Sequence, residues 1–227
     1  MKYDAVLFDA AETLFTTRGS VGEIYAGVAR RFGSTAQPTE IQEAFRRNFP
    51  HSGPLHPNDE KQWWKTVVRN VFDEVGMLRD FDQFFDEIYD LFRDSRGWML
   101  FPETADVLDA CRHHGMKLGL ISNFDSRLYS VLKDLRIDSF FSSITICSET
   151  GYAKPQPEIF HAAIASLRTT PDRILFAGDS LVDDYTAGQS VGLDAVLVDR
   201  SGRYPAMRSI KRIASLTDLL PIAGIAE

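Results

Sequence analysis

Near its N-terminus the chain reads Tyr3-Asp4-Ala5-Val6-Leu7-Phe8-Asp9-Ala10-Ala11-Glu12-Thr13-Leu14-Phe15, a short apolar run that turns polar at Asp9. A run this short and this rich in strand-forming residues predicts a buried strand. At the centre of a parallel sheet, the carboxyl end of such a strand opens into the crevice where ligands bind. Asp9 would then lie at that crevice. Short polar residues also close strands and start turns, so Asp9 alone does not establish a site.

The composition is that of an ordinary globular protein. The chain has 227 residues, of which 44% are hydrophobic and 25% charged, and its net charge is −7. This charge argues against a nucleic-acid groove and against an anionic membrane surface as partner. No apolar stretch is long enough to span a bilayer, and no signal-peptide core precedes the first strand. Cys111 and Cys147 are too isolated to predict a disulfide framework or a zinc site. We therefore expect a cytoplasmic protein.

Residues 16–99 show the hydrophobic spacing of successive helices. Helices are predicted to begin near Val21, Pro38, Pro57 and Phe81. A helical block of this length after the first strand indicates an insertion and not an ordinary crossover. We expect most of its aromatic side chains to pack inside a small helical bundle.

From position 100 onward the pattern changes to alternating helices and strands. Helices are predicted at 103–114, 127–135 and 157–167, and strands at 116–122, 143–147, 174–177 and 195–198. A further helix is predicted after the strand at 174–177, ending at about 191. Strands separated by helices form right-handed βαβ units. The sequence therefore predicts an α/β fold with a parallel sheet covered on both faces. A short helix is expected at 216–220, and no element is predicted for 200–212.

Two later segments carry groups suited to an anion. Ser122 and Asn123 end the strand at 116–122, and a hydroxyl there can donate to an anionic oxygen, although Ser-Asn is also common in turns. Lys154 is followed by Pro155 and Pro157, which stiffen the loop before a helix N-terminus. Loop lysines are usually solvated, but one held in this way is better placed to meet an anion.

A third segment, Gly178-Asp179-Ser180-Leu181-Val182-Asp183-Asp184, ends the strand at 174–177. Three carboxylates this close repel one another unless they are exposed or gathered around a cation. Hard oxygen ligands of this kind suit Mg²⁺. An acidic helix N-terminus, favoured by the helix dipole, would explain one or two of them but not all three.

In this order the segments resemble the four motifs of the haloacid dehalogenase-like hydrolase superfamily. The motifs are Asp9 with Thr13, Ser122-Asn123, Lys154-Pro155-Gln156-Pro157, and Gly178-Asp179 with Asp183-Asp184. The resemblance covers essentially the whole chain, and the pair Trp63-Trp64 resembles a subgroup of hydrolase-domain proteins. The resemblance of the four motifs implies a Rossmann-like, doubly wound parallel sheet at 1–15 and 100–227, with an all-helical cap inserted at 16–99.

The resemblance also implies a covalent phosphoryl-transfer mechanism on a small phosphorylated metabolite. Asp9 would be the nucleophile and form an aspartyl-phosphate. Mg²⁺ would be held by Asp9, the backbone carbonyl of Ala11, Asp179 and one of Asp183 and Asp184, of which Asp184 matches the family better.

The remaining site residues would act on the phosphoryl group and the nucleophile. Ser122, Asn123 and Lys154 would bind phosphoryl oxygens, and Lys154 would also offset the carboxylate charge. Thr13 would orient Asp9. The cap would exclude water and select the substrate.

One position departs from the family pattern. Phosphatases of this superfamily carry a second aspartate two residues after the nucleophile, which protonates the leaving oxygen and later activates water. Here that residue is Ala11. Acid–base catalysis by such a group is worth ~10²–10⁴ in rate. Glu12 is adjacent, but one step along an extended backbone aims a side chain elsewhere.

Three functions remain open from the sequence. The first is a Mg²⁺-dependent phosphatase or phosphoryl-transfer enzyme with weak acid catalysis. The second is a metal-independent 2-haloacid dehalogenase, in which a halide leaves without protonation but Asp179 would face an anionic substrate with no cation between them. The third is a binding or regulatory protein with little turnover.

Overall fold

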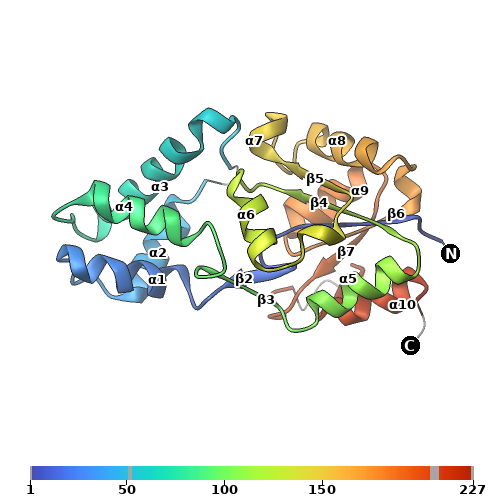
Figure 1. Ribbon diagram of the computed structural model, residues 1–227, viewed down its shortest axis with the longest axis horizontal. Coiled ribbons are helices and arrows are strands. Elements are labelled where there is room, and N and C mark those ends of the chain that lie inside the picture. Colours follow the sequence, from blue (N-terminus) through green and yellow to red (C-terminus); the bar gives the residue numbers. More distant parts are fainter. Residues whose placement is uncertain (1, 51–52, 205–209, 226–227) are drawn as a thin grey trace.

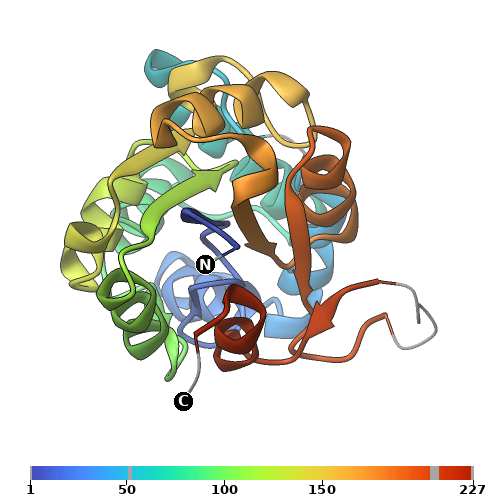
Figure 2. The same cartoon turned by 90° about the vertical axis from the view of Figure 1, so that its right-hand side faces the viewer.

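The computed structural model describes residues 2–50, 53–204 and 210–225. Its centre is a six-stranded, all-parallel sheet with the order β5-β4-β1-β6-β7-β8 (Figures 1 and 2). The strands are β1 (Ala5–Phe8), β4 (Lys117–Ser122), β5 (Ser143–Ile146), β6 (Ile174–Gly178), β7 (Asp194–Val198) and β8 (Arg212–Ile213). The first strand therefore lies inside the sheet, between β4 and β6. The predicted α/β fold class is confirmed.

Alternate residues of β1 face the two sides of the sheet. Val6 and Phe8 belong to one buried cluster and Ala5 and Leu7 to the other, and all four are fully buried. A strand covered on both faces reads as one continuous apolar run, which is why residues 5–8 do not alternate with polar residues. Helices lie on both sides of the sheet in Figure 2. They are α5 (Thr104–His113), α6 (Arg127–Asp134) and α10 (Leu219–Ala223) against Val6 and Phe8, and α7 (Cys147–Thr150), α8 (Pro157–Leu167) and α9 (Ala187–Ser190) on the other side.

In its described residues, the inserted segment 16–99 has four α-helices, which lie beyond one end of the sheet (Figure 1). They are α1 (Val21–Ala29), α2 (Pro38–Asn48), α3 (Glu60–Val75) and α4 (Phe81–Leu91). Aromatic rings fill the space between these helices, for example Phe72 against Phe84 with ring centroids 4.7 Å apart. The expected aromatic bundle is therefore present, and we call these residues the insert.

The insert is not helical throughout. Its two ends pair as an antiparallel ribbon, β2 (Phe15–Thr17) with β3 (Trp98–Leu100). The expectation of helix after helix from 16 to 99 is wrong at these ends, and both predicted boundaries fall within the ribbon. Three-residue strands carry too few residues for an alternation to show in the sequence, and their pairing depends on a partner more than 80 positions away.

The C-terminal region contains a further element that the sequence did not predict. The strand β8 pairs in parallel with β7 at the sheet edge. Two residues are too few for a periodic signal. Part of the unassigned stretch 200–212, residues 205–209, lies outside the described residues. None of the helices in the described ranges is both long and apolar enough to cross a membrane.

Candidate active site

The carboxyl ends of three adjacent strands bring the sequence motifs together. Asp9 follows β1, Ser122 ends β4 and Asp179 follows β6, and these three strands are neighbours in the sheet. The backbone of Asp9 is held against β6, because its N–H donates to the carbonyl of Ala177 at 2.9 Å. Asp9 and Ser122 are both buried, at 6% and 4% exposure.

Lys154 forms hydrogen bonds to two carboxylates of the site. Its Nζ donates to Oδ1 of Asp9 and to Oδ1 of Asp184, both at 2.6 Å. The loop that carries it is held by Asn123, whose Nδ2 donates to the carbonyl of Lys154 at 2.9 Å while its Oδ1 accepts from the backbone N–H of Lys154 at 2.7 Å. The side chain of Asn123 thus positions the lysine, and its expected contact with phosphoryl oxygens stays a prediction. Both residues line the cavity described below.

Asp9, Asp179 and Asp184 form an acidic cluster in which one carboxylate oxygen from each lies within 4.8 Å of the others. Asp184 reaches this cluster from a π-helix (Leu181–Thr186), a wide helical turn often found at functional sites. Its Oδ2 accepts the backbone N–H of Ser180 at 2.9 Å. A Cβ on Gly178 would lie 2.4 Å from Cγ of Asp184, so glycine is needed for this approach.

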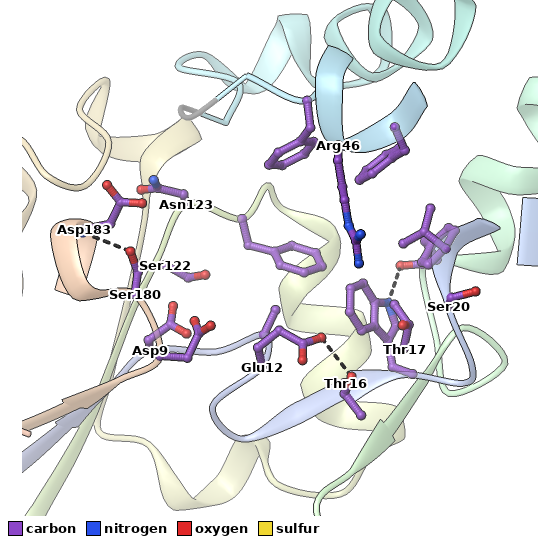
Figure 3. A pocket seen from close by; sticks show the side chains of 18 of the residues that line it. Asp9, Glu12, Thr16, Thr17, Ser20, Arg46, Ser122, Asn123, Ser180 and Asp183 are labelled. Carbon is purple, nitrogen blue, oxygen red and sulfur yellow. Dashed lines mark hydrogen bonds between the residues drawn. The ribbon is translucent and has the colours of Figure 1, made fainter. Parts of the chain in front are cut away.

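Asp183 lies outside the cluster, as far as the described residues show. Its backbone N–H donates to Oγ of Ser180, which caps the π-helix, and Figure 3 draws this bond. The sequence left Asp183 and Asp184 open as the distal carboxylate. The structure brings Asp184 to Asp9, because adjacent residues on a helical turn point in different directions.

Burial sets the ionisation of the cluster. It raises the pKa of Asp9 to about 7, while Lys154 opposes the rise and the charges of Asp184 and Asp179 add to it. Burial and the charge of Asp184 raise the pKa of Asp179 to about 6. For Lys154, burial lowers the pKa, but the carboxylates of Asp184 and Asp9 outweigh it and the net shift is upward. The lysine is therefore cationic, and protons compete for the carboxylates near neutral pH.

The turn after Asp9 orients the nucleophile candidate. Thr13 is buried, and its Oγ1 donates to Oδ2 of Asp9 at 2.9 Å, so each oxygen of this carboxylate is held by a different donor. Glu12 adopts a left-handed backbone with φ 64°, and its Oε1 accepts from Oγ1 of Thr16 at 2.8 Å. Figure 3 shows the Glu12 side chain extending toward Thr16 and away from Asp9. Ala11 offers only its methyl group and its backbone.

The site opens into a cavity of about 780 Å³ between the strand ends and the insert. The motif residues form its floor, and most of the remaining wall is apolar. The insert contributes several large aromatic side chains, namely Phe45, Phe49, Trp64, Phe85, Phe92 and Trp98. A chamber of this kind suits a ligand with a polar group at the strand ends and an apolar body.

The sequence did not identify two arginines in the site. Nη2 of Arg203 donates to Oδ2 of Asp179 at 2.8 Å. Arg200 donates to Oε1 of Glu103 at 2.6 Å and to the carbonyl of Thr13 at 2.9 Å, behind the nucleophile turn. Both arginines belong to the stretch 200–212, where no helical or strand periodicity gave a signal. Ser180 was likewise missed, since a serine beside an aspartate is ordinary turn chemistry.

Comparison with known proteins agrees with this arrangement. Residues 3–192 match the sequence profile of the haloacid dehalogenase-like hydrolases, a span that includes all four motifs. The chain belongs to this family. It is 31% identical over 204 residues to haloacid dehalogenase-like hydrolase domain-containing protein 3 of Danio rerio, an alignment that covers 86% of this chain and 84% of the relative. The resemblance inferred from the motifs is therefore confirmed.

Solved structures share the fold at lower identity. A HAD phosphatase from Thermococcus onnurineus has a TM-score of 0.66 and 24% identity, covering 97% of this chain and 98% of its own. A magnesium-bound HAD-hydrolase from Bacillus subtilis has a TM-score of 0.74 and 19% identity, and the match covers 99% of this chain and 100% of that one. A third structure is an L-2-haloacid dehalogenase from Xanthobacter autotrophicus with chloropropionic acid covalently bound. It has a TM-score of 0.76 and 17% identity, and the match covers 99% of this chain and 100% of that one. At these identities the likeness concerns the fold.

Proposed function

We propose that this family member is a Mg²⁺-dependent phosphohydrolase that uses Asp9 as nucleophile on small phosphate esters or anhydrides with good leaving groups. The observation that carries the proposal is the position of Lys154, whose Nζ lies 2.6 Å from both Asp9 and Asp184 at the floor of the cavity. One buried cation beside three carboxylates leaves a net negative charge that favours a bound metal ion.

The donor set fits Mg²⁺. Three carboxylates have oxygens within 4.8 Å of one another, and hard oxygen ligands at this density suit this ion. Asp9, Asp179 and Asp184 would hold it, with the backbone carbonyl of Ala11 as the fourth ligand that the family resemblance implies. Asp183 drops out of the proposed set. When bound, Mg²⁺ would supply positive charge that keeps the carboxylates ionised and offsets the phosphoryl oxygens.

Each of the site residues has a separate role in the proposed reaction. Thr13 and Lys154 each hold one oxygen of Asp9, so its carboxylate is oriented for in-line attack on phosphorus. The bond from Asp9 to phosphorus forms while the ester P–O bond breaks. Lys154 and Ser122 bind the phosphoryl oxygens as negative charge shifts to the leaving group. Water then attacks phosphorus, the bond to Asp9 breaks to restore its carboxylate, and both water protons leave on the product as dihydrogen phosphate.

The missing acid restricts the leaving group. Ala11 cannot protonate a departing oxygen, and Glu12 is turned toward Thr16. An alkoxide would have to leave unprotonated, which slows an alkyl ester by ~10²–10⁴ relative to an enzyme with a positioned acid. An aryl oxide or a carboxylate is a stable anion and needs little protonation. Aryl and acyl phosphates are therefore the expected substrates.

A single-turnover experiment tests the proposal. Radiolabelled phenyl phosphate is mixed with excess protein and Mg²⁺, and the acid-quenched protein is digested to locate the label. We expect label on Asp9, its loss with chelator, and none in Asp9→Asn. Turnover with no Mg²⁺ requirement would contradict the proposal. Binding of Mg²⁺ and beryllium fluoride without any turnover would favour a binding or regulatory role instead.

One observation favours a second candidate, 2-haloacid dehalogenation. A halide needs no proton, so Ala11 would carry no penalty, and the cavity is largely apolar. Against it, Asp179 and Asp184 would face an anionic substrate with Lys154 as the cation beside them. Release of chloride from 2-chloropropionate in the presence of chelator would support this candidate, and its absence would exclude it for that substrate.

A further inference from the structure

The arginines that line the cavity differ in whether an acidic side chain pairs with them. Four of them line it within the described part of the chain, namely Arg46, Arg127, Arg200 and Arg203. Arg127 pairs with Asp125, Arg200 with Glu103 and Arg203 with Asp179. For Arg46, the described ranges 2–50, 53–204 and 210–225 contain no ion-pair or hydrogen-bond partner. Within those ranges its positive charge therefore has no counter-charge.

Arg46 comes from the last turn of α2, in the insert, and Figure 3 shows its side chain extending from that helix into the cavity. Asp9 and Ser122 lie on the opposite side of the same view. A basic residue in the last turn of a helix is favoured by the helix dipole, which explains its presence but not its direction. The adjacent Arg47 occupies the same turn, points to the surface and pairs with Glu74. Among the arginines that line the cavity in the described part of the chain, Arg46 alone has no partner there.

We propose that the substrate carries, besides its phosphoryl group, an apolar body and a second anionic group, a carboxylate, and that Arg46 binds this second group. This inference rests on the proposed function, because it places the phosphoryl group at Asp9 and Lys154. The aromatic side chains between the two ends, such as Phe49 and Trp64, would contact the apolar body. An arginine fork matches a carboxylate in a bidentate manner, which makes this contact selective as well as attractive.

Acidic side chains also line this cavity, namely the aspartates Asp9, Asp179, Asp183 and Asp184 at the strand ends and one glutamate. The glutamate is Glu12, whose Oε1 accepts from Oγ1 of Thr16. A bound carboxylate must therefore lie on the Arg46 side, and a substrate with no carboxylate would leave Arg46 without a counter-charge. Arg46 would thus be a specificity residue contributed by the insert, separate from the groups that act on phosphorus.

Calorimetry with non-hydrolysable phosphonates tests the proposal in saturating Mg²⁺. Two matched pairs are used, ethylphosphonate with 3-phosphonopropionate and benzylphosphonate with 4-carboxybenzylphosphonate. We expect wild type to bind the carboxylate member of at least one pair about 10- to 100-fold more tightly, the range for a charge-assisted hydrogen-bonded pair. Arg46→Gln should abolish this preference and leave binding of the other members unchanged. Arg47→Gln, the matched control, should retain it.

The outcomes separate this inference from the proposed function. Equal binding within both pairs by wild type, or a preference that survives in Arg46→Gln, would overturn the role of Arg46. Mg²⁺-dependent labelling of Asp9 by phenyl phosphate would persist in that case and leave the proposed function standing. Failure of all four phosphonates to bind wild type would count against both. The thermal unfolding midpoints of the two arginine variants, compared with wild type, show whether either variant misfolds.

Discussion

At position 11 a methyl group stands where the family's phosphatases place a carboxylate, two residues after the nucleophile. The surrounding turn does not compensate for it. Glu12 takes a left-handed backbone at φ 64° and is bonded to Thr16, while Thr13 uses its hydroxyl on Asp9. The turn therefore orients the nucleophile without offering a proton donor. This makes Ala11 the residue at which the chemistry of the site can be changed most directly.

The substitution Ala11→Asp should raise the hydrolysis of alkyl phosphates, by up to ~10²-fold if the new carboxylate comes within hydrogen-bond reach of the leaving oxygen. Its effect on aryl phosphates should be smaller in the first step, because those leaving groups need little protonation. The measurement compares kcat/KM for an alkyl and an aryl ester in both proteins at saturating Mg²⁺. Ala11→Asn, with a similar shape and no acid, is the control. A wild type that cleaves both esters equally fast would show that another residue donates the proton.

At the scale of elements, two links join α3 of the insert to the start of α6. Nε1 of Trp64 donates to Oδ2 of the fully buried Asp125, which also pairs with Arg127 at 2.6 Å. Glu60 accepts from the backbone N–H of Ser126 at 2.9 Å. A buried carboxylate that lost one of these donors would remain charged and less well satisfied. These links hold the insert over the strand ends and close one side of the cavity.

The substitution Trp64→Phe removes the indole donor to Asp125 while keeping an aromatic ring. We expect the free energy of unfolding to fall by about 1–3 kcal/mol, the cost of leaving part of a buried charged acceptor unpaired. Urea unfolding measures it. Trp63→Phe is the matched control, because Trp63 touches the ring of Trp64 but has no hydrogen bond to Asp125 within the described residues. Equal losses in the two variants would indicate that packing, and not this hydrogen bond, stabilises the contact.

Considered as a whole, the molecule places its chemistry between two bodies of chain. The ends of the parallel strands supply the floor of the cavity, and the insert, which lies beyond one end of the sheet in Figure 1, supplies most of the aromatic wall. The chain enters and leaves the insert side by side, through the paired strands β2 and β3. The acidic cluster lies beneath this wall, so its charge is poorly solvated and affects the stability of the entire fold.

The metal-free protein should become less stable as pH rises through the range where the cluster ionises. The pKa of Asp179 is raised to about 6 by burial and by Asp184, whereas an aspartate in an unfolded chain has a pKa of about 3.9. The native state thus holds a proton that the unfolded state releases. The contribution of this proton to the unfolding free energy is fully present below pH ~4 and is lost as pH rises through 6. Burial moves the pKa of Asp9 in the same direction, to about 7.

Urea unfolding in chelator at pH 5 and pH 8 tests this, with Asp179→Asn as the comparison. Relative to the variant, wild type should lose up to about 2 kcal/mol of unfolding free energy between these pH values. Saturating Mg²⁺ should remove the loss in wild type, because the ion favours the ionised carboxylates. A difference between the two proteins that does not change with pH would show that Asp179 is not the titrating group.

The sequence predicted the parts of the fold that depend on local pattern. Apolar runs marked β1, β4 and β6, and the Pro157 start and the span of α8 were visible in the order of residues. The ribbon of β2 and β3 and the strand β8 were missed. All three depend on pairing with another segment, which for β2 and β3 is far away along the chain, and strands of two or three residues carry no measurable period. A partner more than 80 positions away leaves no trace in the local composition.

The sequence by itself determined that acidic and hydroxyl side chains would follow parallel strands and that Lys154 would lie in a loop before a helix, because strand ends and helix starts can be read from the local pattern. Which of those side chains meet was decided by the tertiary structure. The π-helix brings Asp184 to Lys154 and leaves Asp183 aside, and α2 turns Arg46 into the cavity while Arg47 pairs at the surface. Neighbours along a helix differ by about 100° in direction. Only the packing of each helix against the rest of the molecule decides which of two similar residues faces the site.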